Sequence, residues 1–259
     1  MSVVIWDLDT DKVINRLKEG KRVDERAFDE YREIKMQKQI SENADGSARV
    51  QLGETDIIAG VKFELGKPYS DTPEEGTMSV NSELLPLASP TFEFGPPSVE
   101  SVELARVVDR GIRESKCMDF KSFCIREKEL AYTANIDIYV VNYAGNLFDA
   151  SAFAAIAALA ETKLPKVEED KLVAGEYSGK LKLSRKPILS TFAKISNSIV
   201  IDPNLAEEKA MNARFSVSTT EDEMLCAFQK GLGGSFTSAE LSSMLDIALK
   251  KGKELRKLL

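Results

Sequence analysis

A strand-to-helix junction at residues 143–150 is the feature that most limits how this chain can fold. Residues 132–143 alternate apolar and polar side chains, as a half-buried strand does, and the alanine-rich run at 151–159 favours a helix. Gly145 lies between the two, where a glycine lets the backbone approach another group closely. Because the first N–H groups of a helix are unpaired and point outward, such a junction is typical of an anion site.

The residues after Gly145 do not supply the charge that an anion site needs. Phosphate sites usually add an arginine, whose guanidinium binds phosphate through two hydrogen bonds. Here Asn146 and Leu147 follow the glycine, and Asp149 would repel a phosphate. The sequence therefore predicts the backbone of a phosphate site without its cation.

The absence of histidine excludes several classes of catalytic and metal site. None of the 259 residues is histidine, which rules out a Ser-His-Asp triad, a Cys-His pair and a histidine-ligated metal. The three cysteines, Cys117, Cys124 and Cys226, show no CxxC spacing, and we interpret them as reduced and mostly buried. We therefore predict no metal and no cofactor, so that any catalysis would rest on carboxylates, lysine, tyrosine or a borrowed group.

The net charge of −7 limits how this chain can meet a nucleic acid. A protein that grips nucleic acid by itself is usually basic, so this one would need a local cationic patch or the surface of a partner. No apolar stretch is long enough to span a bilayer, and residues 1–20 are unlike a signal peptide. We expect a cytoplasmic protein with no membrane contact.

The order of the predicted elements indicates an α+β fold in two halves, each a mainly antiparallel sheet backed by helices. In the first half we predict helices at 9–19 and 98–116, a loop at 66–76, and strands at 34–43, 50–52, 56–65, 77–85 and 132–143. In the second half we predict a closing helix and strands at 189–195, 199–201, 213–219 and 225–230. The charged segment 163–185 lacks strong periodicity and is interpreted as the crossover between them.

Local signals mark the turns and helix ends. The sequence NADG at 43–46 predicts a hairpin, because Asp-Gly supplies the positive φ of a tight turn. Ser98 is predicted to cap the helix at 98–116, and Thr237 with Glu240 forms a capping box for the last helix. We divide the chain into an N-terminal helical extension, a first half and a second half, at 1–23, 24–165 and 166–259.

The helix at 98–116 carries a row of cations. Arg106, Arg110, Arg113 and Lys116 fall on one face, opposite the apolar residues that face the core. One interpretation is a solvated face with local ion pairs, from Arg106 to Asp109 and from Arg110 to Glu114. The other is a track for the phosphates of a nucleic acid, for which arginine is well suited.

Carboxylates gather after the predicted strand at 199–201. Asp202, Glu207 and Glu208 are of the type that holds Mg²⁺ or acts as acid and base. A solvated helix face explains the two glutamates equally well, and from the residues alone we favour it.

These segments resemble the RNase PH family of phosphorolytic exoribonucleases. The resemblance covers roughly residues 20–255 and rests on the turn NADGSA, on Gly145 before the alanine-rich helix, and on the runs IDP at 201–203 and GGSFT at 233–237. Two longer runs, VNSELLPLASP at 80–90 and RVVDRGIRES at 106–115, are similar to the non-catalytic RNase PH-like subunits of archaeal exosomes.

The resemblance implies an assembly and an activity. The chain would have two RNase PH-type halves and would form a six-membered ring, as a trimer of heterodimers with a catalytic RNase PH-like partner. RNA-binding cap proteins would dock on the ring, which would degrade single-stranded RNA from 3′ to 5′ by phosphorolysis.

The resemblance also implies which positions are degenerate. Active members hold phosphate with a Gly-Thr-Arg run, where this chain has Gly145, Asn146 and Leu147. They also use a pair of aspartates, and the matching positions here hold Glu208 and Arg214. A phosphate-binding arginine and a catalytic aspartate are therefore missing, which implies a subunit without catalysis of its own.

A role in RNA binding is implied for the helix at 98–116. In the similar subunits its arginines, here Arg106, Arg110 and Arg113, face the active-site cleft of the partner and contact the RNA backbone. Two other hypotheses stay open. One is a divergent exoribonuclease that acts alone through Asp202, Glu208 and a divalent ion, and the other is a pure scaffold whose arginines form only inter-subunit ion pairs.

Overall fold

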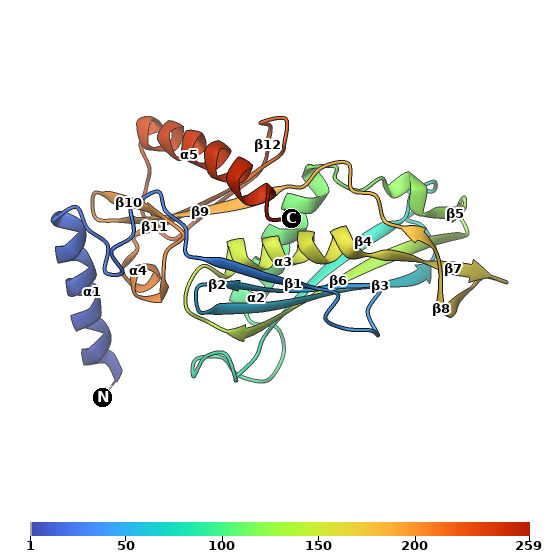
Figure 1. Cartoon of the computed structure of the whole chain (residues 1–259), viewed down its shortest axis with the longest axis horizontal. Helices are drawn as coiled ribbons and strands as arrows, with labels where there is room; N and C mark the ends of the chain where they lie inside the picture. Colours follow the sequence, from blue (N-terminus) through green and yellow to red (C-terminus); the bar gives the residue numbers. More distant parts are fainter. Residues whose placement is uncertain (1) are drawn as a thin grey trace.

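A mixed six-stranded sheet forms the centre of the first half. The computed structural model describes residues 2–259, and their side chains from Thr10 onward. The strands are β1 (Ile34–Lys38), β2 (Gly46–Leu52), β3 (Thr55–Gly66), β4 (Thr77–Leu84), β5 (Cys124–Arg126) and β6 (Leu130–Asn142). They lie in the order β1-β2-β3-β6-β4, with β5 on β6, and only the pairing of β4 with β6 is parallel (Figure 1).

Helix α3 (Leu147–Glu161) joins the two halves. It packs on β2 and β3 of the first sheet and on β9 (Ile188–Ile195) of the second. Its alanines are almost all fully buried, and their small side chains let the helix lie close to both sheets. Helix α2 (Val99–Glu114) covers β4 and contacts α3, and the short helix η1 (Phe120–Phe123) precedes β5.

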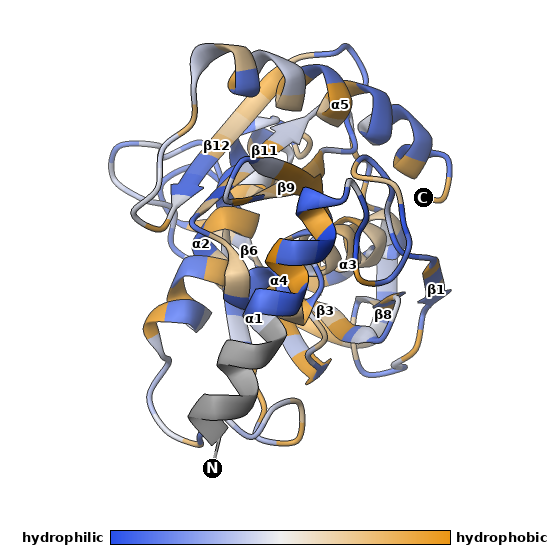
Figure 2. Ribbon diagram, turned by 90° about the vertical axis from the view of Figure 1, so that its left-hand side faces the viewer, coloured by the Kyte–Doolittle hydropathy of each residue, from blue (hydrophilic) through white to orange (hydrophobic). Residues whose placement is uncertain are grey.

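The second half is an antiparallel sheet in the order β10-β9-β11-β12, and α5 packs on β9 and β11. Its other elements are β10 (Ser198–Ile201), α4 (Leu205–Ala210), β11 (Ala213–Thr219), β12 (Leu225–Gly231) and α5 (Ser238–Arg256). Polar and apolar segments alternate along α5, as expected for a helix with one face on a sheet (Figure 2). Helix α1 (Ser2–Lys18) contacts α4. The predicted α+β fold is confirmed.

Four local predictions need correction. The tight Asp-Gly turn at 43–46 is wrong, because neither Asp45 nor Gly46 has a positive φ and Gly46 already belongs to β2. The first helix begins at Ser2 and not at residue 9. Helix α2 ends at Glu114, and Lys116 has a φ of 53°, so Lys116 is not part of the cationic row. The segment predicted as an irregular crossover forms the hairpin of β7 (Lys163–Glu168) and β8 (Lys171–Lys180).

The hairpin was missed because β8 is mostly exposed, and an exposed strand needs no alternation of apolar residues. Its turn residues, Glu169 and Asp170, have φ of 48° and 62°, the positive values that a tight hairpin turn requires. Over residues 2–259, no helix has the length and apolar content that a membrane span requires.

Candidate functional site

Asn146 is the N-cap of α3, and its side chain makes its hydrogen bonds to Asp149 and Asp202. It has a left-handed φ of 54°, and its side-chain oxygen accepts the N–H of Asp149 as an N-cap. The other end of the same amide donates to Asp202 at 2.8 Å and to the Asp149 carboxylate at 2.9 Å. Since the Asn146 side chain is fully buried by these contacts, it presents no group to an incoming anion.

Gly145 is required by the close approach of another segment. Its φ is +98°, and a Cβ built on it would lie 2.5 Å from the nitrogen of Leu205, where α4 begins. The backbone of the two segments is joined there by a hydrogen bond of 3.1 Å from Leu205 N–H to the carbonyl of Ala144. Because Gly145 has no side chain, α4 can pack closely against the start of α3, and this brings Glu208 to that position.

Glu208 supplies a carboxylate at the predicted anion position. One of its oxygens accepts the backbone N–H of Asn146 at 2.9 Å, and the other accepts the Tyr143 hydroxyl at 2.6 Å. Burial raises the pKa of Glu208, against the opposing effect of these hydrogen bonds and of the nearby Arg214 and Arg32. The backbone N–H of Asn146, at the N-terminus of α3, thus already has an acceptor, which is the Glu208 side chain of the same chain.

Asp149, which we expected to repel a phosphate, faces the contact between the two halves instead. It accepts hydrogen bonds from the Tyr31 hydroxyl at 2.7 Å and from the backbone N–H of Thr191 at 3.0 Å. Burial raises the pKa of Asp149 to about 6. The carboxylate at the anion position is therefore that of Glu208, and the expectation for Asp149 was wrong.

A cavity of about 190 Å³ brings Leu147, Glu208 and Arg214 together, although they lie far apart in the sequence. Arg214, on β11, forms an ion pair with Glu103 of α2, and its guanidinium lies 4.0 Å from the centroid of the Phe148 ring. Only 8% of Arg214 is exposed, so this cation is committed to contacts within the chain. We call this space, with its three degenerate positions, the degenerate cavity.

Asp202 and Glu207 are buried in a network of arginines. Asp202 pairs with Arg32 at 2.7 Å and with Arg26 at 2.9 Å, and Glu207 pairs with Arg22 at 2.6 Å. The favoured interpretation of the glutamates as a solvated helix face is therefore wrong for Glu207, which is fully buried. Among residues 10–259, no group of three or more metal-ligating side chains of the kinds His, Cys, Asp and Glu was found.

Sequence reasoning missed the three arginines of this network. They lie in the charged run KRVDERAFDEYRE at 21–33, which has the composition of an exposed segment. Their partners are about 170–185 positions away, so no local spacing links them. The one usable signal was the excess of arginine over lysine in the run, since arginine is preferred in buried ion pairs.

The three predicted RNA-binding arginines differ in how freely they can reach a ligand. The side chain of Arg106 has no ion pair or hydrogen bond to any residue whose side chain the structure describes. Arg110 lies 3.6 Å from Glu114, and its side chain is 68% exposed. Arg113 donates to both oxygens of Asp109, at 2.9 and 3.1 Å. The predicted pair of Arg106 with Asp109 is therefore wrong, because Asp109 binds Arg113.

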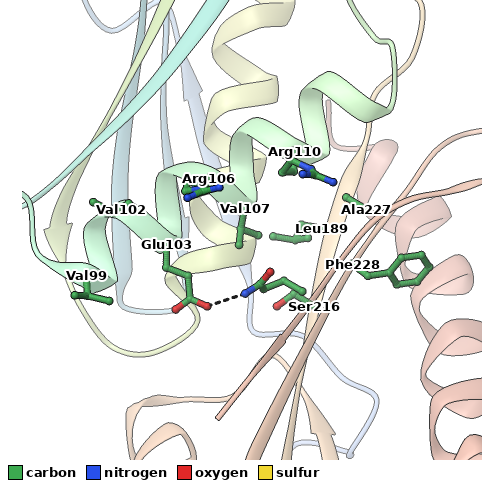
Figure 3. A pocket seen from close by; sticks show the side chains of 11 residues that line it. Val99, Val102, Glu103, Arg106, Val107, Arg110, Leu189, Ser216, Ala227 and Phe228 are labelled. Atoms are coloured by element: carbon green, nitrogen blue, oxygen red, sulfur yellow. Dashed lines mark hydrogen bonds between the residues drawn. The ribbon is translucent and has the colours of Figure 1, made fainter.

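Arg106 and Arg110 line a groove of about 460 Å³ between α2 and β12 (Figure 3). Its floor is apolar, with Val107 of α2 and Leu189 of β9. Glu103 lies at the opposite end of the groove, where its carboxylate accepts a hydrogen bond of 3.2 Å from the side-chain amide of Gln229. Glu103 of α2 thus lies at the degenerate cavity, and Arg106 and Arg110 lie on the same helix, one and two turns further toward its C-terminus. A cationic surface therefore lies next to the degenerate cavity.

Comparisons with known proteins identify two matching domain models. Domain 1 of the 3′ exoribonuclease family matches residues 30–165, and domain 2 of the same family matches residues 186–251. The chain is 48% identical over 254 residues to an exosome complex component Rrp42 from Thermococcus gammatolerans, covering 96% of this chain and 93% of that protein. It is 43% identical over 255 residues to the protein of the same name from Methanothermobacter thermautotrophicus, covering 97% and 94%.

Solved structures agree in fold. A chain of the Archaeoglobus fulgidus exosome with RNA bound to the active site matches with a TM-score of 0.91 and 39% identity, covering 98% of both chains. A chain of an archaeal exosome core matches with a TM-score of 0.87 and 35% identity, covering 98% of this chain and 97% of that one.

Proposed function

The chain belongs to the RNase PH family of 3′ exoribonucleases, and from this membership we propose that it is a non-catalytic ring subunit of an archaeal RNA exosome. It structures the active site of a catalytic RNase PH-like partner and helps to bind RNA during 3′-to-5′ phosphorolytic degradation. The observation that carries the proposal is the Glu208 carboxylate on the backbone N–H of Asn146, the N-cap of α3, where a phosphate would have to bind.

The degenerate cavity is unsuited to inorganic phosphate for electrostatic reasons. Phosphate would meet the carboxylate of Glu208, which already accepts the N–H of Asn146 and the Tyr143 hydroxyl, and like charges at hydrogen-bonding distance repel strongly. Arg214 cannot offset this repulsion, because its guanidinium is paired with Glu103. Leu147 adds an apolar side chain where an arginine would be needed for bidentate recognition.

RNA binding is assigned to Arg106, Arg110 and Arg113. The first two are available on the surface of α2, and the third extends the row while held by Asp109. Contacts of arginine with phosphate oxygens position a strand without reading its bases, which suits an enzyme complex that degrades many sequences. An acidic chain with one cationic surface also suits a site shared with a partner better than independent binding of RNA.

The assembly that follows is a six-membered ring of three heterodimers. The partners are the catalytic RNase PH-like subunit, RNA-binding cap proteins and single-stranded RNA, and the expected compartment is the cytoplasm. A divergent exoribonuclease acting alone through Asp202, Glu208 and a divalent ion has less support. Asp202 is fully buried and paired with two arginines, so its carboxylate is not available to a metal.

An RNA phosphorolysis assay tests the proposal directly. The purified chain alone is expected to release no nucleoside diphosphates from RNA, whereas its mixture with the catalytic partner is expected to release them. Phosphate-dependent release by the chain alone would mean that an unrecognised site in this chain performs the chemistry. Release that depends on a divalent ion and not on phosphate would favour the exoribonuclease alternative.

Replacing Glu208 by alanine is expected to create a phosphate site where the carboxylate now lies. The variant keeps the N–H of Asn146 and the hydroxyl of Tyr143 as donors, and it loses the repelling charge. Inorganic phosphate at ten times its Kd would stabilise the folded chain by about 1.4 kcal/mol, or raise its Tm by roughly 3–5 °C. Thermal unfolding of the purified chain with and without phosphate measures this shift.

The matched control is Glu100→Ala. It removes an exposed carboxylate from the wall of the same cavity and leaves the Glu208 carboxylate at the N-terminus of α3 in place. The control and the wild-type chain are expected to show no phosphate-dependent shift. RNA degradation by rings that contain Glu208→Ala is expected to stay close to that of the wild type. A collapse of that activity would refute the claim that this subunit takes no part in the chemistry.

A further inference from the structure

Arg106 is unpaired although helix α2 places a carboxylate on either side of it. Side chains three positions apart on a helix lie next to each other, and Glu103 and Asp109 lie three positions before and after Arg106. Either carboxylate could neutralise this arginine, yet among the residues whose side chains the structure describes neither does. Other residues must therefore hold both carboxylates away from it.

Each of the two carboxylates is held by another arginine. Arg113, one turn further along α2, donates to both oxygens of Asp109, at 2.9 and 3.1 Å. Glu103 is held from the second half of the chain. Its Oε1 accepts a hydrogen bond from Nη2 of Arg214 on β11 and another, of 3.2 Å, from the side-chain amide of Gln229 on β12. Since the amide is neutral, Arg214 supplies the positive charge that balances Glu103.

The guanidinium of Arg214 is fixed in this position by close packing. Its central carbon lies 4.0 Å from the centroid of the Phe148 ring. A Cβ on Gly231 of β12 would lie 2.7 Å from Nη2 and 2.9 Å from the central carbon, so the glycine leaves the room that the guanidinium needs. The buried Nε has no hydrogen-bond partner among the described residues, so the pair with Glu103 is the main polar contact of this arginine.

We propose that Arg214, at one of the degenerate catalytic positions, is a positioning residue for RNA. It holds Glu103 away from Arg106 and so keeps Arg106 available to an RNA phosphate. This inference rests on the proposed function and adds a residue that acts on RNA binding through another side chain. The ion pair joins the two halves of the chain, so the state of Arg106 depends on a contact that α2 does not make within itself.

The position of Glu103 explains why its charge has to be balanced. Glu103 and Arg106 both line the groove of about 460 Å³, one turn apart on the same wall (Figure 3). Without Arg214, the carboxylate of Glu103 would either pair with Arg106 or repel a phosphate bound there. An aspartate at position 214 would leave Glu103 unbalanced and add a second negative charge. The reversed charge at this position therefore has an electrostatic reason.

The test uses the ring assembled from this chain and its catalytic partner, with a labelled oligoadenylate and no phosphate, so that RNA binds without being degraded. Fluorescence anisotropy gives the Kd over a series of salt concentrations. Arg214→Leu is expected to lower the slope of log Kd against log salt by roughly 0.7, the contribution of one phosphate contact. The Kd at 0.1 M salt is expected to rise about fivefold, which is that slope taken over the tenfold range below 1 M.

Rescue separates this role from a merely structural one. Arg214→Leu combined with Glu103→Gln is expected to restore the wild-type Kd and salt slope, because no carboxylate then competes for Arg106. If Arg214 only supports the fold, the double variant stays as weak as the single one, and that result overturns the proposal. Should the leucine variant not assemble into a ring, Arg214→Gln with and without Glu103→Gln gives the same comparison.

The matched control is Lys230→Leu, which also removes one positive charge from the second sheet. Lys230 is exposed on β12 and does not line the groove, so its loss is expected to leave the Kd and the slope unchanged. An equal effect of Lys230→Leu would assign the change to net charge and overturn the role of Arg214. An unchanged Kd and slope in Arg214→Leu overturn it directly.

Failure of this inference is distinguishable from failure of the proposed function. Charge reversal at Arg106 and Arg110 tests the RNA-binding face itself and does not depend on Arg214. A normal response to that reversal with no response to Arg214→Leu removes the positioning role alone. No response to either variant removes the RNA-binding face as well.

Discussion

Replacing Arg22 by leucine is expected to lower the free energy of unfolding by about 3–5 kcal/mol. The Arg22 side chain is fully buried and donates to both oxygens of Glu207, at 2.8 and 2.6 Å. It also donates to the backbone carbonyls of Ile201 and Asp202, at 3.0 and 2.8 Å. The leucine variant would leave a buried carboxylate and two carbonyls without this donor, and urea unfolding measures the loss.

Two further variants separate the parts of this effect. Glu207→Gln is expected to cost less than Arg22→Leu, because Arg22 keeps its bonds to the backbone carbonyls. Arg16→Leu is the control, since Arg16 pairs with the exposed Glu25, and its cost is expected to stay below about 1 kcal/mol. If Arg22→Leu costs no more than Arg16→Leu, the buried network does not hold the N-terminal segment to the second half.

Reversing the charge of Arg106 and Arg110 together, as Arg106→Glu with Arg110→Glu, is expected to weaken RNA binding by the assembled ring at least about tenfold. Both arginines line the groove beside β12, and neither holds another element in place, so the ring itself should form. The slope of log Kd against log salt is expected to fall by roughly 0.7 for each RNA phosphate that an arginine no longer neutralises. Degradation at low RNA concentration should fall in parallel.

Reversal at Arg110 and Arg113 is expected to act in the same direction, but it also removes the bonds of Arg113 to Asp109 and Met78. Lys171→Glu is the control, on the hairpin of β7 and β8 at the other end of the first half (Figure 1). If reversal at Arg106 and Arg110 changes neither the Kd nor its salt slope, the row serves as a scaffold and does not bind RNA.

Short-range patterns made most of the fold predictable. In β6, the alternation of Ile136, Ile138 and Val140 with polar residues matches the strand that the structure has, and all three side chains are buried. Ser98 caps α2, and Thr237 with Glu240 caps α5, as predicted. These features depend on residues within four positions of one another, so the sequence displays them directly.

The candidate site was predictable only in part. Resemblance and local chemistry pointed to Gly145, Leu147, Glu208 and Arg214, and the structure places the last three around one cavity. They did not indicate which carboxylate would fill the anion position. That choice depends on the approach of α4 to Gly145, which brings Glu208 within 2.9 Å of Asn146 and leaves Asp149 in the contact between the halves.

By itself, the sequence determined the type and order of most of the elements, the absence of histidine chemistry and the missing cation at the junction. Only the tertiary structure decided which charges neutralise one another. It paired Arg22 with Glu207 and Arg214 with Glu103, and it left Arg106 available. The physical reason is that periodicity and capping act within one element, whereas ion pairs and burial depend on which distant segments the packed core brings together.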